Sequence, residues 1–124
     1  MIILDHVIVP SNDNRAGAAF FGLVFDLEPE DRGHFAAVRV NDSLTLDFET
    51  HTDVSSEHYA FLVGEDEFDG IFARITASAA SFGSGPFSAD DGEINHRRGG
   101  RGVYFVGGPD PHLWEIMTRA ETGT

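Results

Sequence analysis

The sequence of 124 residues contains no cysteine, which excludes disulfide bonds, thiolate metal sites and cysteine nucleophiles. Basic residues are also scarce, with eight against 21 acidic residues and a formal charge of −13. That charge disfavours nucleic acids, anionic membranes and other polyanions as partners. No apolar run is long enough to span a membrane, and no basic leader precedes the first strand pattern. We therefore expect a soluble, cytoplasmic protein.

Hydrophobic residues are plentiful by comparison. They make up 41% of the chain, and eleven of the aromatic side chains are Phe. This composition is typical of a folded domain with a sizeable core and not of a disordered chain. The length fits one domain.

The first half of the chain predicts a strand, a helix and a hairpin. Residues 2–9 form an apolar strand ending at Pro10, and a helix with i, i+3, i+4 apolar spacing follows to about Val24. Residues 28–33 are charged and turn-rich. Strands at 35–40 and 44–49 then form a hairpin across a favourable Asn-Asp turn.

The second half starts the same pattern again. A strand at 58–63 precedes a helix that begins at Glu65 and is expected to end near Gly83. A short extended piece lies around 86–88. The closing hairpin, residues 102–118, surrounds a Gly-Gly-Pro-Asp-Pro turn.

The two halves form an internal repeat in which each half reads as strand, helix and three shorter strands. The last strands align, Leu46–Thr50 against Trp114–Thr118, so that Asp47 is the counterpart of Glu115. The sequence therefore predicts an α+β domain of two βαβββ modules, one at about 1–52 and the other at about 56–120.

Glu115 has an unusual setting because it lies in an apolar strand and shares its face with Leu113 and Met117. A buried carboxylate without a partner costs several kcal/mol, so it needs a cation or a strong donor. His6 and His58 stand at matching places in the two modules. Imidazoles and a carboxylate suit a divalent metal, although a lone strand histidine also fits a hydrogen-bonded core position.

The chain resembles the vicinal oxygen chelate superfamily, which includes glyoxalase I, fosfomycin-resistance and bleomycin-resistance proteins and extradiol dioxygenases. The resemblance runs from Asp5-His6-Val7 to the last strand. Residues 108–115, Gly-Pro-Asp-Pro-His-Leu-Trp-Glu, resemble the family ending Asp-Pro-Asp-Gly-His-Leu-x-Glu. It implies a cupped, mostly antiparallel mixed sheet with helices outside.

The resemblance also implies a site. Its metal ligands would be His6, His58 and Glu115, and the metal would be Fe, Mn, Ni, Co or Zn. Asp47 or Glu49 would act as a fourth ligand or as a base for proton transfer. The family commonly forms homodimers, so the ligands are expected from one chain or from two.

Within the superfamily, residues His96 and Tyr104 come close to the extradiol dioxygenase signature, in which they would hold and polarise a catecholate. The sequence departs from that signature at Gly108 and by one extra residue before Glu115. Asp47 would serve as the base of a glyoxalase-like lyase or isomerase. The cluster Arg97, Arg98 and Arg101 either receives an anionic substrate or is simply solvated.

The leading hypothesis is a metal-dependent enzyme acting on a small substrate that chelates the metal through vicinal oxygens. Its reaction would be of the lyase or isomerase type, or a ring-cleaving dioxygenation. The alternative is a metal-free dimeric binding protein that sequesters a small molecule, as bleomycin-resistance proteins do.

Overall fold

The computed structural model describes residues 1–121, which form two compact units. The first comprises residues 1–54 together with the turn 108–110, and the second comprises residues 55–107 and the stretch from Pro111 onward. No helix in the described part of the chain is long and apolar enough to cross a membrane.

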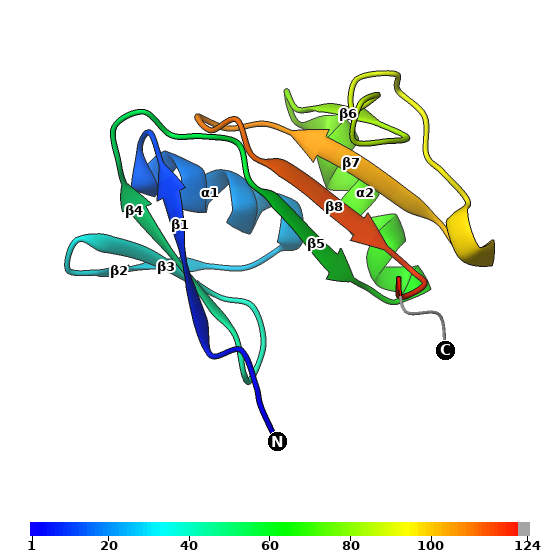
Figure 1. Ribbon diagram of the computed structural model, residues 1–124. Coiled ribbons are helices and arrows are strands. Elements are labelled where there is room, and N and C mark those ends of the chain that lie inside the picture. The colour runs from blue at the N-terminus through cyan, green and yellow to red at the C-terminus, as the bar shows by residue number, and fades with distance from the viewer. Residues whose placement is uncertain (122–124) are drawn as a thin grey trace. The chain divides into compact units, whose positions relative to one another are not determined.

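The first unit is one βαβββ module (Figure 1). Its sheet has the order β1-β4-β3-β2, with β1 parallel to β4 and the other pairs antiparallel. The Asp13 side chain caps the helix by accepting a hydrogen bond from the backbone N–H of Ala16. The elements are β1 (His6–Ser11), α1 (Asn14–Phe25), β2 (Pro29–Arg32), β3 (Phe35–Arg39) and β4 (Thr45–Thr50).

The second unit repeats this topology, with the sheet order β5-β8-β7-β6 and a parallel β5–β8 pair. Helix α2 lies across one face of the sheet (Figure 1). The elements are β5 (His58–Leu62), α2 (Glu65–Ala77), β6 (Ser81–Gly83), the 3-10 turn η1 (Arg97–Gly99), β7 (Gly102–Val106) and β8 (Leu113–Met117). The predicted pair of βαβββ modules is therefore confirmed.

In both units strand alternation separates a core face from an open face. Leu46 and Phe48 are buried on the core side of β4, which packs against α1. In β8 the buried pair is Trp114 and Ile116, so Glu115 points to the opposite face. This alternation directs the carboxylate away from the packed core.

Several predicted boundaries were wrong. The first strand begins at His6 and includes Pro10, which is tolerated because β1 is an edge strand. The charged stretch 28–33 contains strand β2. Helix α2 ends at Ala77 because Ser78 leaves helical geometry, and the strand expected near 86–88 lies at Ser81–Gly83.

Candidate functional site

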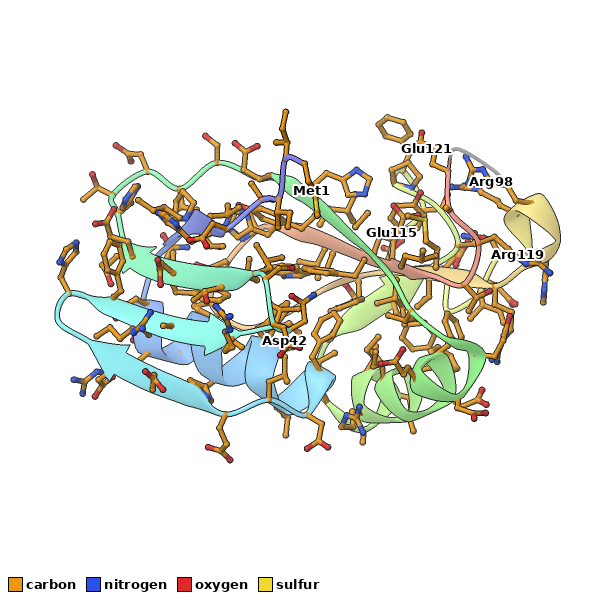
Figure 2. All side chains as sticks on the ribbon, turned by 90° about the horizontal axis from the view of Figure 1, so that it is seen from below. Met1, Asp42, Arg98, Glu115, Arg119 and Glu121 are labelled. Atoms are coloured by element: carbon orange, nitrogen blue, oxygen red, sulfur yellow. The ribbon has the colours of Figure 1, made fainter. Side chains whose placement is uncertain are left out.

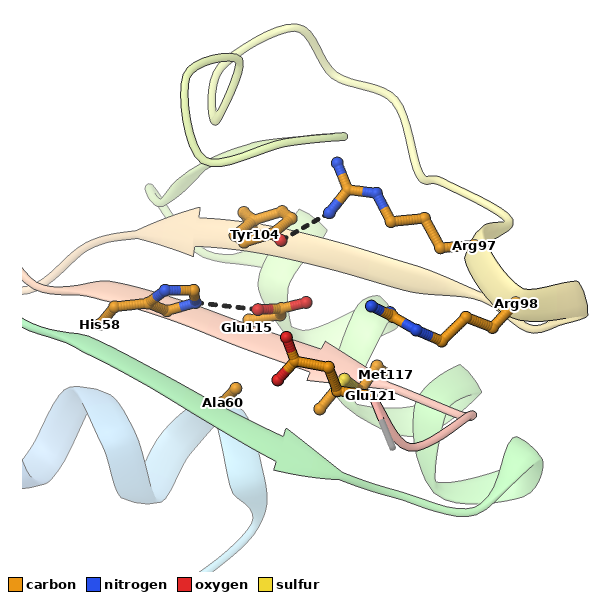
Figure 3. A pocket seen from close by; sticks show the side chains of 8 residues that line it. All are labelled: His58, Ala60, Arg97, Arg98, Tyr104, Glu115, Met117 and Glu121. Carbon is orange, nitrogen blue, oxygen red and sulfur yellow. Dashed lines mark hydrogen bonds and ion pairs between the residues drawn. The ribbon is translucent and has the colours of Figure 1, made fainter. Parts of the chain in front are cut away.

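The second unit holds a pocket of about 300 Å³ on the open face of its sheet (Figure 3). Strands β5, β7 and β8 form its floor, and η1 supplies one wall. The lining residues are His58, Ala60, Arg97, Arg98, Tyr104, Glu115, Met117 and Glu121.

His58 and Glu115 meet on this floor. In the parallel β5–β8 pair Ala60 lies opposite Glu115, so His58 is the diagonal neighbour of Glu115 on the same face. His58 Nε2 lies 2.8 Å from Glu115 Oε1. The Glu115 side chain is 11% exposed and that of His58 is 47% exposed. The carboxylate predicted to need a partner therefore has one in His58.

This pair also fits a metal. Two ligand atoms that each lie about 2.1 Å from a metal, at right angles, are about 3.0 Å apart. The separation of 2.8 Å between Nε2 and Oε1 is close to that value. An imidazole and a carboxylate that share one floor, with a pocket open above them, suit a divalent metal with free positions.

Tyr104 stands beside Glu115 because β7 and β8 place the two residues directly opposite each other. Its phenol oxygen accepts a 2.7 Å hydrogen bond from Arg97 Nη1. Burial raises the pKa of Tyr104, the charge of Glu115 raises it further, and Arg97 opposes the shift. Tyr104 is therefore protonated at neutral pH and is a hydrogen-bond donor in the pocket.

His6 and Asp47 lie in the first unit. The His6 side chain is 60% exposed, and its Nδ1 lies 2.9 Å from Asp5 Oδ2. A carboxylate on one ring nitrogen is the usual support for a histidine that binds metal through the other. Asp47 faces Ile8 and Ala37 across the sheet, which is the place that Glu115 occupies in the second unit.

Glu49, the other candidate for fourth ligand or base, contacts two histidines. Its two carboxylate oxygens lie 2.7 Å from His51 Nε2 and 2.8 Å from His34 Nε2. The hydrogen bond from His51 is the largest cause of the lowered pKa of Glu49, and His34 contributes its charge. Neither histidine was predicted to have a role, although Phe35 pairs with Glu49 in the hairpin and brings His34 close.

The structure thus brings together three of the predicted site residues, His58, Tyr104 and Glu115. His96 is exposed and does not line the pocket. Within residues 1–121 no three His, Asp or Glu side chains gather in a metal-binding arrangement.

Three residues that line the pocket were not predicted to belong to the site. Strand alternation could have indicated two of them, Ala60 and Met117, because they lie on the same face as Glu115. Glu121 follows the last strand and had no such signal. His112, which received no role, is fully buried and accepts a hydrogen bond at Nδ1 from the backbone N–H of Glu57.

No protein-family model matches the chain, and no curated protein does. Two solved structures match it closely over their whole length. Oxidase ChaP-H1 is 41% identical, with a TM-score of 0.91 over 99% of this chain and 100% of its own. Oxidase ChaP-H2 is 38% identical, with a TM-score of 0.90 over 97% of this chain and 95% of its own.

More distant structures share the fold. The fosfomycin resistance protein FosX from Mesorhizobium loti is 20% identical, with a TM-score of 0.72 over 98% of this chain and 97% of its own. A mutant of FosX from Listeria monocytogenes, complexed with Mn(II) and 1S,2S-dihydroxypropylphosphonic acid, is 21% identical. Its TM-score is 0.71 over 99% of this chain and 95% of its own.

Proposed function

This chain belongs to the vicinal oxygen chelate superfamily, and from that membership we propose that it is a divalent-metal-dependent enzyme that oxidises a small molecule chelating the metal through two adjacent oxygens. The observation that carries the proposal is the His58–Glu115 pair, 2.8 Å apart on the floor of an open pocket. The choice of oxidation is supported by the two relatives at 38% and 41% identity, both of them oxidases by name.

The proposed metal ligands are His58 and Glu115 together with His6. His6 is the first residue of β1, as His58 is of β5. The Asp5 carboxylate contacts Nδ1 of His6 and orients its ring. A homodimer is part of the proposal, with His6 supplied by this chain or by a second copy. When bound, the metal would supply Lewis acidity to the two substrate oxygens, and a redox-active metal such as Fe or Mn would also supply a route for electrons to molecular oxygen.

The chain's own residues would bind and orient the substrate. A tyrosine is ordinarily protonated at neutral pH, and burial raises the pKa of Tyr104 further. Its hydroxyl would therefore donate a hydrogen bond to a substrate oxygen, while the Arg97 guanidinium donates a hydrogen bond to the same hydroxyl oxygen. Asp47 remains the proposed base for proton transfer, because both carboxylate oxygens of Glu49 already contact His34 and His51.

Metal analysis of the purified protein tests the proposal. Wild-type protein is expected to bind one equivalent of Fe, Mn, Ni, Co or Zn, and His6→Ala, His58→Ala and Glu115→Ala are each expected to lose it. His96→Ala is the matched control, because this histidine is exposed and does not line the pocket. Metal retained by all three ligand variants would overturn the ligand assignment.

Oxygen consumption then tests the reaction class. Protein reconstituted anaerobically with Fe(II) or Mn(II) is expected to consume oxygen with a vicinal diol of the catechol type and to lose this activity in Glu115→Ala. Wild-type protein that takes up none of the five metals, yet binds catechols, would instead be a metal-free sequestration protein.

A further inference from the structure

Two consecutive arginines, Arg97 and Arg98, line the pocket opposite the His58–Glu115 pair. All eight basic residues of this chain are arginines, and the net charge is −13. Other arginines, such as Arg15 and Arg101, form ion pairs with acidic groups at the surface. Two adjacent guanidinium groups that line one pocket are therefore unusual in this acidic chain.

The backbone of η1 is bent in a way that presents both side chains. Arg98 has φ 57° and ψ 24°, and Gly99 follows with φ 76°. A left-handed conformation costs a residue with a side chain about 1 kcal/mol. Figure 3 shows that both guanidinium groups extend from this turn over the strands that carry Tyr104 and Glu115.

The two arginines differ in what they already bind. Arg97 donates to the Tyr104 hydroxyl at 2.7 Å and to the Ser84 carbonyl oxygen at 3.3 Å. Arg98 forms no hydrogen bond or ion pair through its side chain with any residue in the range 1–121. Its five N–H donors remain available to a ligand in the pocket.

The charge of the pocket points to the kind of ligand. Its lining carries two guanidinium groups and two carboxylates, those of Glu115 and Glu121 (Figure 3). Three of these residues, Arg98, Glu115 and Glu121, are also labelled in Figure 2. A divalent metal bound by the His58–Glu115 pair would leave this region with two net positive charges. A neutral chelator that loses one proton on binding would balance only one of them.

We propose that Arg98, supported by Arg97, forms a subsite for an anionic oxygen group carried by the substrate in addition to its two chelating oxygens. This inference rests on the proposed function, because it places the chelating end of the substrate at His58 and Glu115. The anionic group is a carboxylate or an ionised phenol, both of which match the planar donors of a guanidinium.

Three probes separate these possibilities: catechol, 3,4-dihydroxybenzoate and pyrogallol. They share the adjacent hydroxyls. The second adds a carboxylate, and the third adds a phenolic hydroxyl that is neutral in solution and would lose its proton on binding to the subsite. Dissociation constants are measured by titration calorimetry with Mn(II)-loaded protein under anaerobic conditions, so that the probes are bound but not oxidised. Wild-type protein is expected to bind at least one of the substituted probes about tenfold more tightly than catechol.

Arg98→Gln is expected to abolish this preference while changing the affinity for catechol less than about twofold. Arg98→Lys should restore part of it, because it keeps the charge and loses the planar fork. Arg15→Gln is the charge-matched control, since the Arg15 side chain is 76% exposed, and it should behave as wild type. A preference that survives in Arg98→Gln, or no preference in wild type, would overturn the subsite.

The same titration with metal-free protein separates the two proposals. Binding of 3,4-dihydroxybenzoate to metal-free protein is measured from shifts of its proton resonances. If the protein takes up no metal but still binds this probe, and Arg98→Gln does not, the subsite proposal is supported and the metal-enzyme proposal is refuted. If metal binds but the preference is independent of Arg98, the metal enzyme stands and the subsite is refuted.

Discussion

Replacing Glu115 by methionine tests whether the buried carboxylate is kept for binding or for stability. The Glu115 side chain is 11% exposed, and that of its partner His58 is 47% exposed. Desolvating a carboxylate to this degree costs several kcal/mol. Hydrogen bonds to the solvent-accessible imidazole of His58 and to the Tyr104 hydroxyl return about 1 kcal/mol each, because solvent screens these interactions.

Methionine has a similar length and, once buried on this floor, contributes about 1.5 kcal/mol through the hydrophobic effect. Metal-free Glu115→Met is therefore expected to unfold with a free energy about 1–2 kcal/mol higher than wild type. For a chain of this size the midpoint of thermal unfolding should rise by about 3–8 °C.

Metal binding should make wild type more stable than Glu115→Met. At a free metal concentration 100 times the dissociation constant, binding stabilises the wild-type native state by about 2.7 kcal/mol and the variant not at all. Thermal unfolding followed by circular dichroism, with and without Mn(II), gives both values. Glu93→Met, an exchange at an exposed loop position, is the control and should leave stability nearly unchanged.

Two results would refute this reasoning. Metal-free Glu115→Met that is less stable than wild type by more than about 1 kcal/mol would make the carboxylate a structural anchor. Equal shifts of wild type and variant on metal addition would show that Glu115 is not a ligand.

The remaining predictions concern the supports of the two units. Asp110→Ala should lower the free energy of unfolding, measured by urea denaturation, by about 2–4 kcal/mol. The buried Asp110 carboxylate accepts hydrogen bonds of 2.7 Å from Ser11 Oγ and from the backbone N–H of Asn12, and the variant loses both. Gly83→Ala should cost about 2–3 kcal/mol, measured in the same way, since an added Cβ would lie only 1.9 Å from the Ser88 carbonyl oxygen and would displace β6. The pKa of Glu49 is lowered from its ordinary value of 4.5, so wild type should have a higher melting temperature than Glu49→Gln above pH 4.5 and should lose this advantage as the pH falls further.

Much of the fold was predictable because it depends on local periodicity. The alternation of Leu46 and Phe48 with Asp47, and of Trp114 and Ile116 with Glu115, assigned the core and open faces of the last strands correctly. The repeat predicted two modules, and both sheets have the same strand order. The errors fall on β2, which is charged along an exposed edge, and on β6, which has three residues.

The site was predictable only in part. Glu115 followed from a simple requirement, that a carboxylate in an apolar strand needs a partner. That requirement left His6 and His58 open as partners, and the structure places His58 2.8 Å from the carboxylate. The pairing of Glu49 with His34 and His51 depends on the register of a hairpin and on side-chain rotamers, which alternation does not specify.

The sequence by itself determined the two βαβββ modules, the core and open faces of the last strand of each module and the acidic residue that departs from its apolar surroundings. Periodicity and composition are enough for these features because they act along the chain. Only the tertiary structure decided which groups share the pocket. Arg97 and Arg98 reach it through a left-handed turn, Tyr104 through the β7–β8 register, and Glu121 through the return of the chain after β8. These contacts depend on the path of the backbone in three dimensions, which the hydrophobic pattern of the sequence does not specify.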